Sequence, residues 1–309
     1  MSSGKTHQRW PNLFLIGAPK CGTTAMSHYL AGHPQIFMSE QAGFKEPWFF
    51  ARDLDGPWRI CKHSDDYLSL FENIPDDAQY WGEASVGYLY SDVAIPDILK
   101  VSPDARFIAM VRSPIEIVQA LFNQHMKMHF ETTFDFHRAW RLQEDRLYGR
   151  APLPAGISNT KLYQYGPYAK LGFQLQRALN IIDGERLHII VYEDFAADPG
   201  KEYRRVLDFL ALPEDGRTEF PVLNKRVRYR YPGLQTFLGK LAQIRRRLHI
   251  PGGWGINALI DRFNAVPETA GDNLPEDFRK ELVDYFRKDI ELLSDILQRN
   301  LSHWIELSE

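Results

Sequence analysis

Cysteine is scarce in this chain. Only Cys21 and Cys61 occur among its 309 residues, which is too few for a disulfide framework, and their spacing is not that of a metal site. The chain also lacks a run of about 18 apolar residues, the length that a membrane-spanning helix requires. These absences predict a protein that resides in the reducing environment of the cytoplasm and does not span a membrane.

Net charge is also small. The chain has 37 lysine and arginine residues against 40 aspartate and glutamate residues, a formal net charge of -3. A field of this size does not attract nucleic acid, so we expect no nucleic-acid partner and only a local anion site. Residues 1–11 are polar, lack the apolar centre of a signal peptide, and are expected to be flexible. Because the sequence has neither repeats nor a clear linker, residues 1–309 are expected to form one domain. The sequence does not predict the oligomeric state.

Short apolar segments alternate with helical patterns. Residues 13–16, 106–111 and 187–192 are apolar runs typical of strands buried on both faces. Helical patterns follow each run, and a last amphipathic helix is expected over residues 275–300. This alternation predicts an α/β fold with a central parallel sheet flanked by helices and a helical C-terminal part. Ligands of such sheets bind beyond the carboxyl ends of the strands.

The strongest motif follows the first of these strands. Residues 17–24 read Gly-Ala-Pro-Lys-Cys-Gly-Thr-Thr and open the next helix. Glycine at both ends lets the backbone turn around an anion, and the helix N-terminus supplies unpaired N–H groups. The segment is close to the nucleotide P-loop, but Thr23 replaces the P-loop lysine and the lysine lies inside the loop as Lys20. The loop therefore predicts a site for a phosphate-like group.

These residues resemble a known family. Residues 19–24 look like the 5′-phosphosulfate loop of the sulfotransferases that use 3′-phosphoadenosine-5′-phosphosulfate (PAPS), in particular the bacterial and heparan-sulfate-type branch. Residues 45–50, Lys-Glu-Pro-Trp-Phe-Phe, are similar to the segment that carries the catalytic glutamate in that branch. Residues 107–114 and 192–195 also fit, so the resemblance extends over nearly the whole chain and implies a P-loop-like, nucleotide-kinase-like fold.

The resemblance implies a role for each matching residue. Lys20 would be catalytic, neutralising charge on the leaving phosphate, and Glu46 would be the base that removes the acceptor proton. The donor PAPS, and its product 3′-phosphoadenosine 5′-phosphate (PAP), would be bound without a metal by a set drawn from the loop and from later segments: Lys20, Cys21, Gly22, Thr23, Thr24, Arg112, the position of Ala120, Tyr192, Arg226 and Arg228.

Two positions depart from the family. The family places a serine eight residues after the arginine that binds the 3′-phosphate, where this chain has Ala120; Ser113, Gln119 and Asn123 remain alternatives for the missing hydrogen bond. Residues 82–86 read Gly-Glu-Ala-Ser-Val, whereas heparan-sulfate-type members have a lysine at the position of Ala84. Glu83 is either a second carboxylate of the site or part of an ion pair that closes a strand. An acceptor other than a sulfated polysaccharide is therefore expected.

The basic segment 224–232 contains Arg226 and Arg228 and is similar to a family loop that covers the 3′-phosphate. The apolar and aromatic residues between 122 and 168 predict a small or lipophilic acceptor, sulfated on a hydroxyl or an amine.

Two other functions stay open at this point. A P-loop ATP-dependent kinase would use Glu193 and Asp194 for magnesium but lacks the lysine at position 23, and a non-catalytic nucleotide-binding protein would keep the loop without using Glu46.

Overall fold

Five strands form one parallel sheet in the computed structural model, which describes residues 9–128, 130–154, 157–223, 227–229, 265–267 and 274–306. The strand order is β2-β3-β1-β4-β5, and all four neighbouring pairs run parallel. The strands are β1 (Leu13–Gly17), β2 (Ile36–Met38), β3 (Tyr80–Glu83), β4 (Arg106–Val111) and β5 (Leu187–Val191). The predicted single α/β domain with a central parallel sheet is confirmed.

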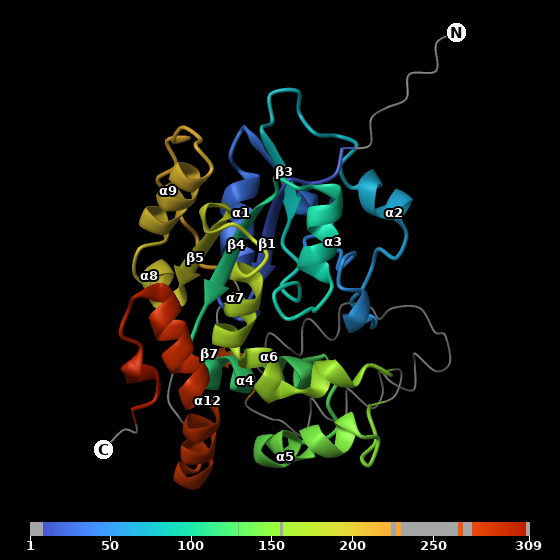
Figure 1. Cartoon of the computed structure of the whole chain (residues 1–309), viewed down its shortest axis with the longest axis vertical. Helices are drawn as coiled ribbons and strands as arrows, with labels where there is room; N and C mark the ends of the chain where they lie inside the picture. Colours follow the sequence, from blue (N-terminus) through green and yellow to red (C-terminus); the bar gives the residue numbers. More distant parts are fainter. Residues whose placement is uncertain are drawn as a thin grey trace.

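Helices surround this sheet (Figure 1). In chain order they are α1 (Thr23–Ala31), α2 (Ser64–Ser69), α3 (Ala94–Val101), α4 (Pro114–Lys127), α5 (Phe136–Leu147), α6 (Tyr165–Ala169), α7 (Leu171–Leu179), α8 (Tyr192–Ala197), α9 (Pro199–Phe209) and α12 (Glu276–Leu297). The C-terminal helix α12 packs on α7 and α4. In the described part of the chain, no helix has both the length and the apolar character needed to cross a membrane.

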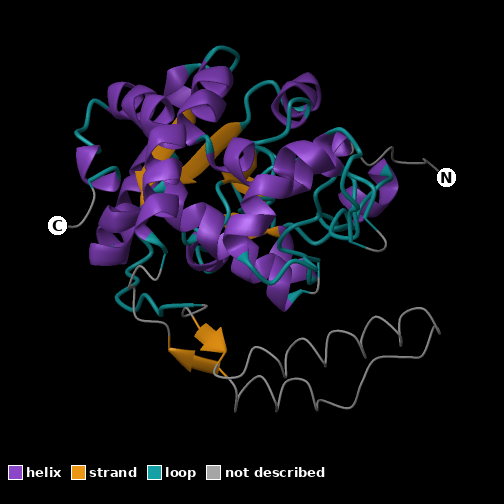
Figure 2. Ribbon diagram, turned by 90° about the horizontal axis from the view of Figure 1, so that it is seen from below, coloured by secondary structure: helices purple, strands orange, loops and turns teal. Residues whose placement is uncertain are grey.

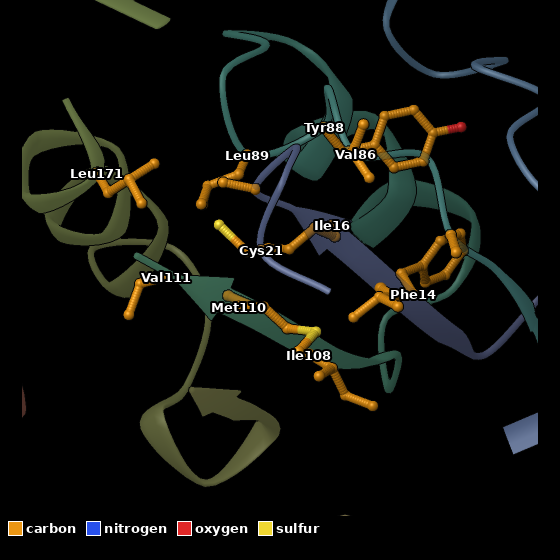
Figure 3. Packing of buried hydrophobic residues seen from close by; sticks show 14 of the residues in the cluster. Phe14, Ile16, Cys21, Val86, Tyr88, Leu89, Ile108, Met110, Val111 and Leu171 are labelled. Atoms are coloured by element: carbon orange, nitrogen blue, oxygen red, sulfur yellow. The ribbon is translucent and has the colours of Figure 1, made fainter. Parts of the chain in front are cut away.

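The three strands predicted from apolar runs are adjacent in the sheet, and two of them, β1 and β4, are almost completely buried. Every residue of β1 is buried, and β4 is buried from Phe107 onward. Apolar side chains of both strands meet in one core cluster, which Figure 3 shows from close by. Helix α4 begins with Pro114 in its first turn, where the missing N–H of proline has no cost.

A separate antiparallel pair, β6 (Val227–Tyr229) and β7 (Ala265–Pro267), lies outside the five-stranded sheet (Figure 2). Arg228 is on β6, where its backbone pairs with Val266. Arg226 and residues 1–8, the main part of the segment expected to be flexible, lie outside the described residues.

Candidate functional site

The loop between β1 and α1 has the backbone that its glycines predict. Gly22 caps α1 with a φ of 88°, a conformation that disfavours side chains, and an added Cβ would lie 2.9 Å from the ring of Phe195. Lys20 also has a positive φ, 67°, and its side chain is exposed. No side chain hydrogen-bonds as an N-cap of α1, and its first turn holds no acidic residue. The first turn, which begins with Thr23 and Thr24, is therefore suited to an anion.

Cys21 is a packing residue of this loop. Its side chain is fully buried, and its thiol donates to the carbonyl oxygen of Pro19 at 3.5 Å. Burial raises the pKa of the Cys21 thiol far above its usual range, although the nearby Arg112 guanidinium acts in the opposite direction. The thiol is therefore protonated and does not supply a reactive thiolate.

Arg112 connects the end of β4 to the loop. Its side chain is buried, and Nη1 donates to the carbonyl oxygen of Lys20 at 3.2 Å. The guanidinium lies 4.0 Å from the ring centre of Tyr192, and its Nε donates to Glu116 of α4. The structure thus brings together three residues that the sequence predicts for one site, Lys20, Arg112 and Tyr192, and adds Glu116, which the sequence did not indicate.

Ala120 lies half-buried on α4, after Arg112 and Glu116 on the same segment of chain. Ser113 is buried at the N-terminus of α4, whereas Asn123 is exposed. Arg228 is placed only by its backbone on β6.

Glu46 lies in a segment that is tied to the same edge of the sheet. The backbone N–H of Ala84, which follows β3, donates to the carbonyl oxygen of Lys45 at 3.1 Å. The Glu46 carboxylate accepts hydrogen bonds from Lys45 Nζ at 2.7 Å and from Trp48 Nε1 at 3.1 Å. Glu46 therefore contacts both the Trp48 indole and the Lys45 ammonium group, and its side chain remains 32% exposed.

Residues 84–89 link the Glu46 segment to the phosphate loop. The N–H of Leu89 donates to the carbonyl oxygen of Ile16 at 2.8 Å. An added Cβ at Gly17, where the loop begins, would lie 2.8 Å from the carbonyl oxygen of Val86. Figure 3 shows Val86, Tyr88 and Leu89 in the same cluster as Ile16 and Cys21. One short segment therefore contacts both the loop that carries Lys20 and the segment that carries Glu46.

Within the described residues, Glu83 forms none of the strand-closing ion pairs that one of the two expectations would require. It is fully buried and accepts hydrogen bonds from the hydroxyl groups of Tyr67, Ser85 and Tyr88. Burial raises the pKa of the Glu83 carboxyl to about 7, against the lowering effect of these hydrogen bonds. This arrangement is not visible in the sequence, because Tyr67 lies on the separate helix α2.

His125 of α4 belongs to a second network beside Lys20. Its Nδ1 lies 3.3 Å from Tyr165 Oη, which donates to Glu131 at 2.9 Å. Glu131 forms two hydrogen bonds of 2.7 Å with Arg146. Burial lowers the pKa of His125 to about 4 against the raising effect of Glu131, and the cations of Arg146 and Lys20 contribute to the lowering. His125 is therefore a neutral imidazole near the loop at pH 7.

The two acidic residues required by a kinase are used elsewhere. Asp194 pairs with Arg299, and Glu193 accepts a hydrogen bond from Trp304 Nε1 at 2.8 Å. Both residues lie in α8 and anchor the C-terminal segment. Among the described residues, no group of three or more histidine, cysteine, aspartate or glutamate side chains could hold a metal ion.

Comparison with known sequences identifies the family. The sequence profile of the sulfotransferase family matches residues 40–216, more than half of the chain. The chain belongs to the sulfotransferase family. The match includes the positions of Glu46, Glu83, Arg112 and Tyr192, whereas the loop with Lys20 precedes it.

Relatives support this assignment. Heparan sulfate glucosamine 3-O-sulfotransferase 6 of Homo sapiens is 27% identical over 217 residues, 69% of this chain and 55% of the relative. Bifunctional heparan sulfate N-deacetylase/N-sulfotransferase 3 of Mus musculus is 25% identical over 268 residues, 76% of this chain and 28% of the relative. Membrane-associated sulfotransferase kil1 of Dictyostelium discoideum is 32% identical over 107 residues, 34% of this chain and 21% of the relative. The chain thus corresponds to about half or less of each relative.

A solved structure agrees with the fold of this sulfotransferase. The crystal structure of a sulfotransferase from Alicyclobacillus acidocaldarius superposes with a TM-score of 0.69 and 24% sequence identity, covering 96% of this chain and all of that chain. The similarity extends over the sheet and the C-terminal helical part, so the predicted architecture is confirmed.

Proposed function

We propose that this enzyme transfers the sulfuryl group of PAPS to a hydroxyl or amine of a small acceptor with an apolar part. The main supporting observation is the contact between Arg112 and Lys20, which joins the end of β4 to the loop before α1. PAPS carries a 5′-phosphosulfate and a 3′-phosphate, and these two elements offer it two cationic side chains and an uncapped helix N-terminus. The residues present therefore fit the donor.

Each residue has one task in this proposal. Arg112, held against Tyr192, binds the 3′-phosphate through its planar guanidinium. When bound, PAPS supplies an electrophilic sulfur and a phosphate leaving group. Glu46 takes the proton of the acceptor as the acceptor atom forms its bond to sulfur. Lys20 and the N–H groups of α1 stabilise the electron pair that remains on the phosphate oxygen when the old S–O bond breaks.

An apolar acceptor is supported by aromatic residues next to Glu46. Trp48, which donates to Glu46, lies 6.2 Å from Trp58, measured between ring centres, and Trp58 lies 5.7 Å from Phe130. His125 continues this series through Tyr163, whose hydroxyl donates to the carbonyl oxygen of Phe130. Trp58, Phe130 and His125 are half-buried, so they can contact a bound molecule.

The segment after β3 offers no cation to an anionic polysaccharide. Ala84, at the position of the lysine found in heparan-sulfate-type members, is fully buried, and Val86 is 8% exposed. We therefore expect phenols and hydroxylated lipophilic compounds to be sulfated by the purified enzyme. Rapid sulfation of a long anionic glycan would contradict this acceptor class, while leaving the donor and the catalytic residues as proposed.

The first experiment is calorimetric titration with PAP, beside ATP with Mg²⁺. We expect PAP to bind with loss of binding in Arg112→Ala, and ATP with Mg²⁺ not to bind. Transfer from radiolabelled PAPS should be abolished in Lys20→Ala and in Glu46→Gln, and Glu46→Gln should still bind PAP. Glu144→Gln, an exposed carboxylate of α5, is the matched control and should keep full activity.

Two outcomes would overturn the proposal. Binding of ATP with Mg²⁺ in place of PAP would support the alternative that the protein is an ATP-dependent kinase. Binding of PAP with no transfer to any acceptor, unaffected by Glu46→Gln, would identify a non-catalytic nucleotide-binding protein.

A further inference from the structure

The buried carboxyl of Glu83 is surrounded by hydroxyl groups. Tyr67 Oη donates to Oε1 at 2.9 Å and Tyr88 Oη at 2.5 Å, and Ser85 Oγ donates to Oε2. An ionised carboxylate accepts hydrogen bonds but cannot donate one. When Glu83 is ionised, each of these hydroxyl groups therefore directs its single proton to the carboxylate and presents its lone pairs to other donors.

Two of the hydroxyl groups use those lone pairs on the backbone of the Glu46 segment. Ser85 Oγ accepts from the N–H of Trp48 at 2.9 Å, and Tyr88 Oη accepts from the N–H of Phe50 at 3.2 Å. Between these residues, the ring of Phe49 stacks on Tyr67 at 4.4 Å with an interplanar angle of 12°. Three consecutive residues, 48 to 50, are thus each held by a different partner of Glu83.

The segment needs such support. Trp48 has a φ of 57°, in the left-handed region that costs a residue with a side chain about 1–2 kcal/mol. Its ring also approaches Gly87 so closely that an added Cβ there would lie 2.2 Å away. The Trp48 indole in turn donates to Glu46 Oε2 at 3.1 Å. The position of the Trp48 backbone therefore determines where the Glu46 carboxylate is directed.

We propose that Glu83 is a positioning residue for the transfer reaction, acting on Glu46 through Ser85, Tyr88 and the backbone of Trp48. The inference rests on the proposed function, in which Glu46 is the base. Glu83 itself is fully buried and does not contact the acceptor. It sets the direction of the hydroxyl hydrogen bonds that fix the base relative to the loop.

Glu83→Gln tests this role, because the amide keeps the shape of the side chain but can donate a hydrogen bond and so reverses the direction of at least one hydroxyl. We expect kcat to fall about ten- to a hundredfold, since a small displacement of a catalytic group is costly. The Kd of PAP and the KM of PAPS should stay at their wild-type values. The matched control is Asp289→Asn, another buried carboxylate, which accepts from the backbone N–H groups of Gly172 and Phe173 between α12 and α7.

Asp289→Asn should lower the thermal midpoint of unfolding but leave kcat unchanged. A merely structural role for Glu83 would give the same result in Glu83→Gln, and an unchanged kcat in that variant would overturn the inference. If Glu83→Gln does not fold, Ser85→Ala and Tyr88→Phe each remove one connection to the segment 48–50. Their kcat should fall with PAP binding retained, and wild-type kcat in both would equally overturn it.

A double variant separates the two proposals. If Glu83 acts through Glu46, the variant with both Glu46→Gln and Glu83→Gln should have the single-turnover rate of Glu46→Gln alone. Additive losses would mean that Glu83 acts independently of Glu46, which contradicts the inference but leaves the base in place. Full activity of Glu46→Gln by itself would instead remove the proposed base, and the role of Glu83 with it.

Discussion

Arg112 is already engaged before any ligand is considered. Its guanidinium contacts three partners, the Lys20 carbonyl oxygen, the Tyr192 ring and the Glu116 carboxylate. A buried guanidinium needs such partners, since an unpaired buried charge is strongly destabilising. Glu116 is also an anion, however, and it pairs with Arg112, the residue that we expect to bind the 3′-phosphate. The two anions therefore compete for Arg112.

Replacing Glu116 with glutamine should tighten PAP binding. The variant loses the competing charge of a half-exposed ion pair, an effect worth roughly two- to fivefold in Kd. Calorimetric titration measures it, with Glu144→Gln on α5 as a control of equal charge change. Weaker binding in Glu116→Gln would mean that Glu116 orients Arg112 for the phosphate and does not compete with it.

Among single residues, the sequence predicted those whose proposed roles depend on a local pattern. Gly22 and Lys20 follow from the loop motif, and Arg112 from its place at the end of an apolar strand. The environment of Glu83 was not predictable, because its partners come from the fold, whereas Glu116 lies only four residues after its partner Arg112. The carboxyl of Glu83, on strand β3, accepts from Tyr67, which lies 16 residues earlier in the chain on helix α2.

Strand length and composition determined which of the five strands could be predicted from the sequence. β1, β4 and β5 are apolar runs of five or six residues, and their predicted bounds agree with the structure to within one residue. β2 has three residues, and β3 reads Tyr-Trp-Gly-Glu, a pattern without alternation. Gly82 of β3 is needed because an added Cβ would lie 1.8 Å from the carbonyl oxygen of Leu13. This close contact between strands is not visible in a single sequence.

The pair of Glu131 and Arg146 belongs to a network that connects helices α4, α5 and α6. Arg146 belongs to α5, and Glu131 also accepts from Tyr165 of α6, which contacts His125 of α4. Both charged side chains are almost completely buried, 1% and 0% exposed. Burial is offset here by two charge-assisted hydrogen bonds in a bidentate arrangement.

Arg146→Ala should lower the free energy of unfolding by about 3–5 kcal/mol, because it leaves the Glu131 carboxylate buried without its cation. Arg141→Ala is the control on the same helix, since Arg141 is 66% exposed and pairs with Glu281 at 3.4 Å. Its loss should cost less than about 1 kcal/mol. Chemical denaturation measures both values. Equal effects of the two substitutions would show that the buried pair contributes no more than a surface pair.

For the whole molecule, two buried carboxyl groups and two half-buried histidines have shifted pKa values that affect stability in opposite directions. Burial raises the pKa of Glu83 from 4.5 to about 7 and that of Asp289 from 3.8 to about 6. Burial lowers the pKa of His125 and of His188 from 6.5 to about 4. The carboxyl groups bind protons more tightly in the folded state, and the imidazoles bind them less tightly.

The sign of each contribution follows from the number of protons bound. Between its ordinary and its folded pKa, each carboxyl binds more protons in the native state, so stability falls as pH rises. In the corresponding range, each histidine binds more protons in the unfolded state, so stability rises with pH. All four ranges overlap between pH 4.5 and 6. Two contributions that fall and two that rise nearly cancel there.

Asp289→Asn should expose this cancellation. With one falling contribution removed, the free energy of unfolding relative to wild type should rise by roughly 1 kcal/mol per pH unit between pH 4.5 and 6. His188→Gln removes a rising contribution and should give the opposite slope. Urea denaturation at a series of pH values measures both differences, in which the groups common to all three proteins cancel. Parallel profiles for wild type and Asp289→Asn would mean that Asp289 has the same pKa in the folded and unfolded chains, and that its burial does not control its protonation.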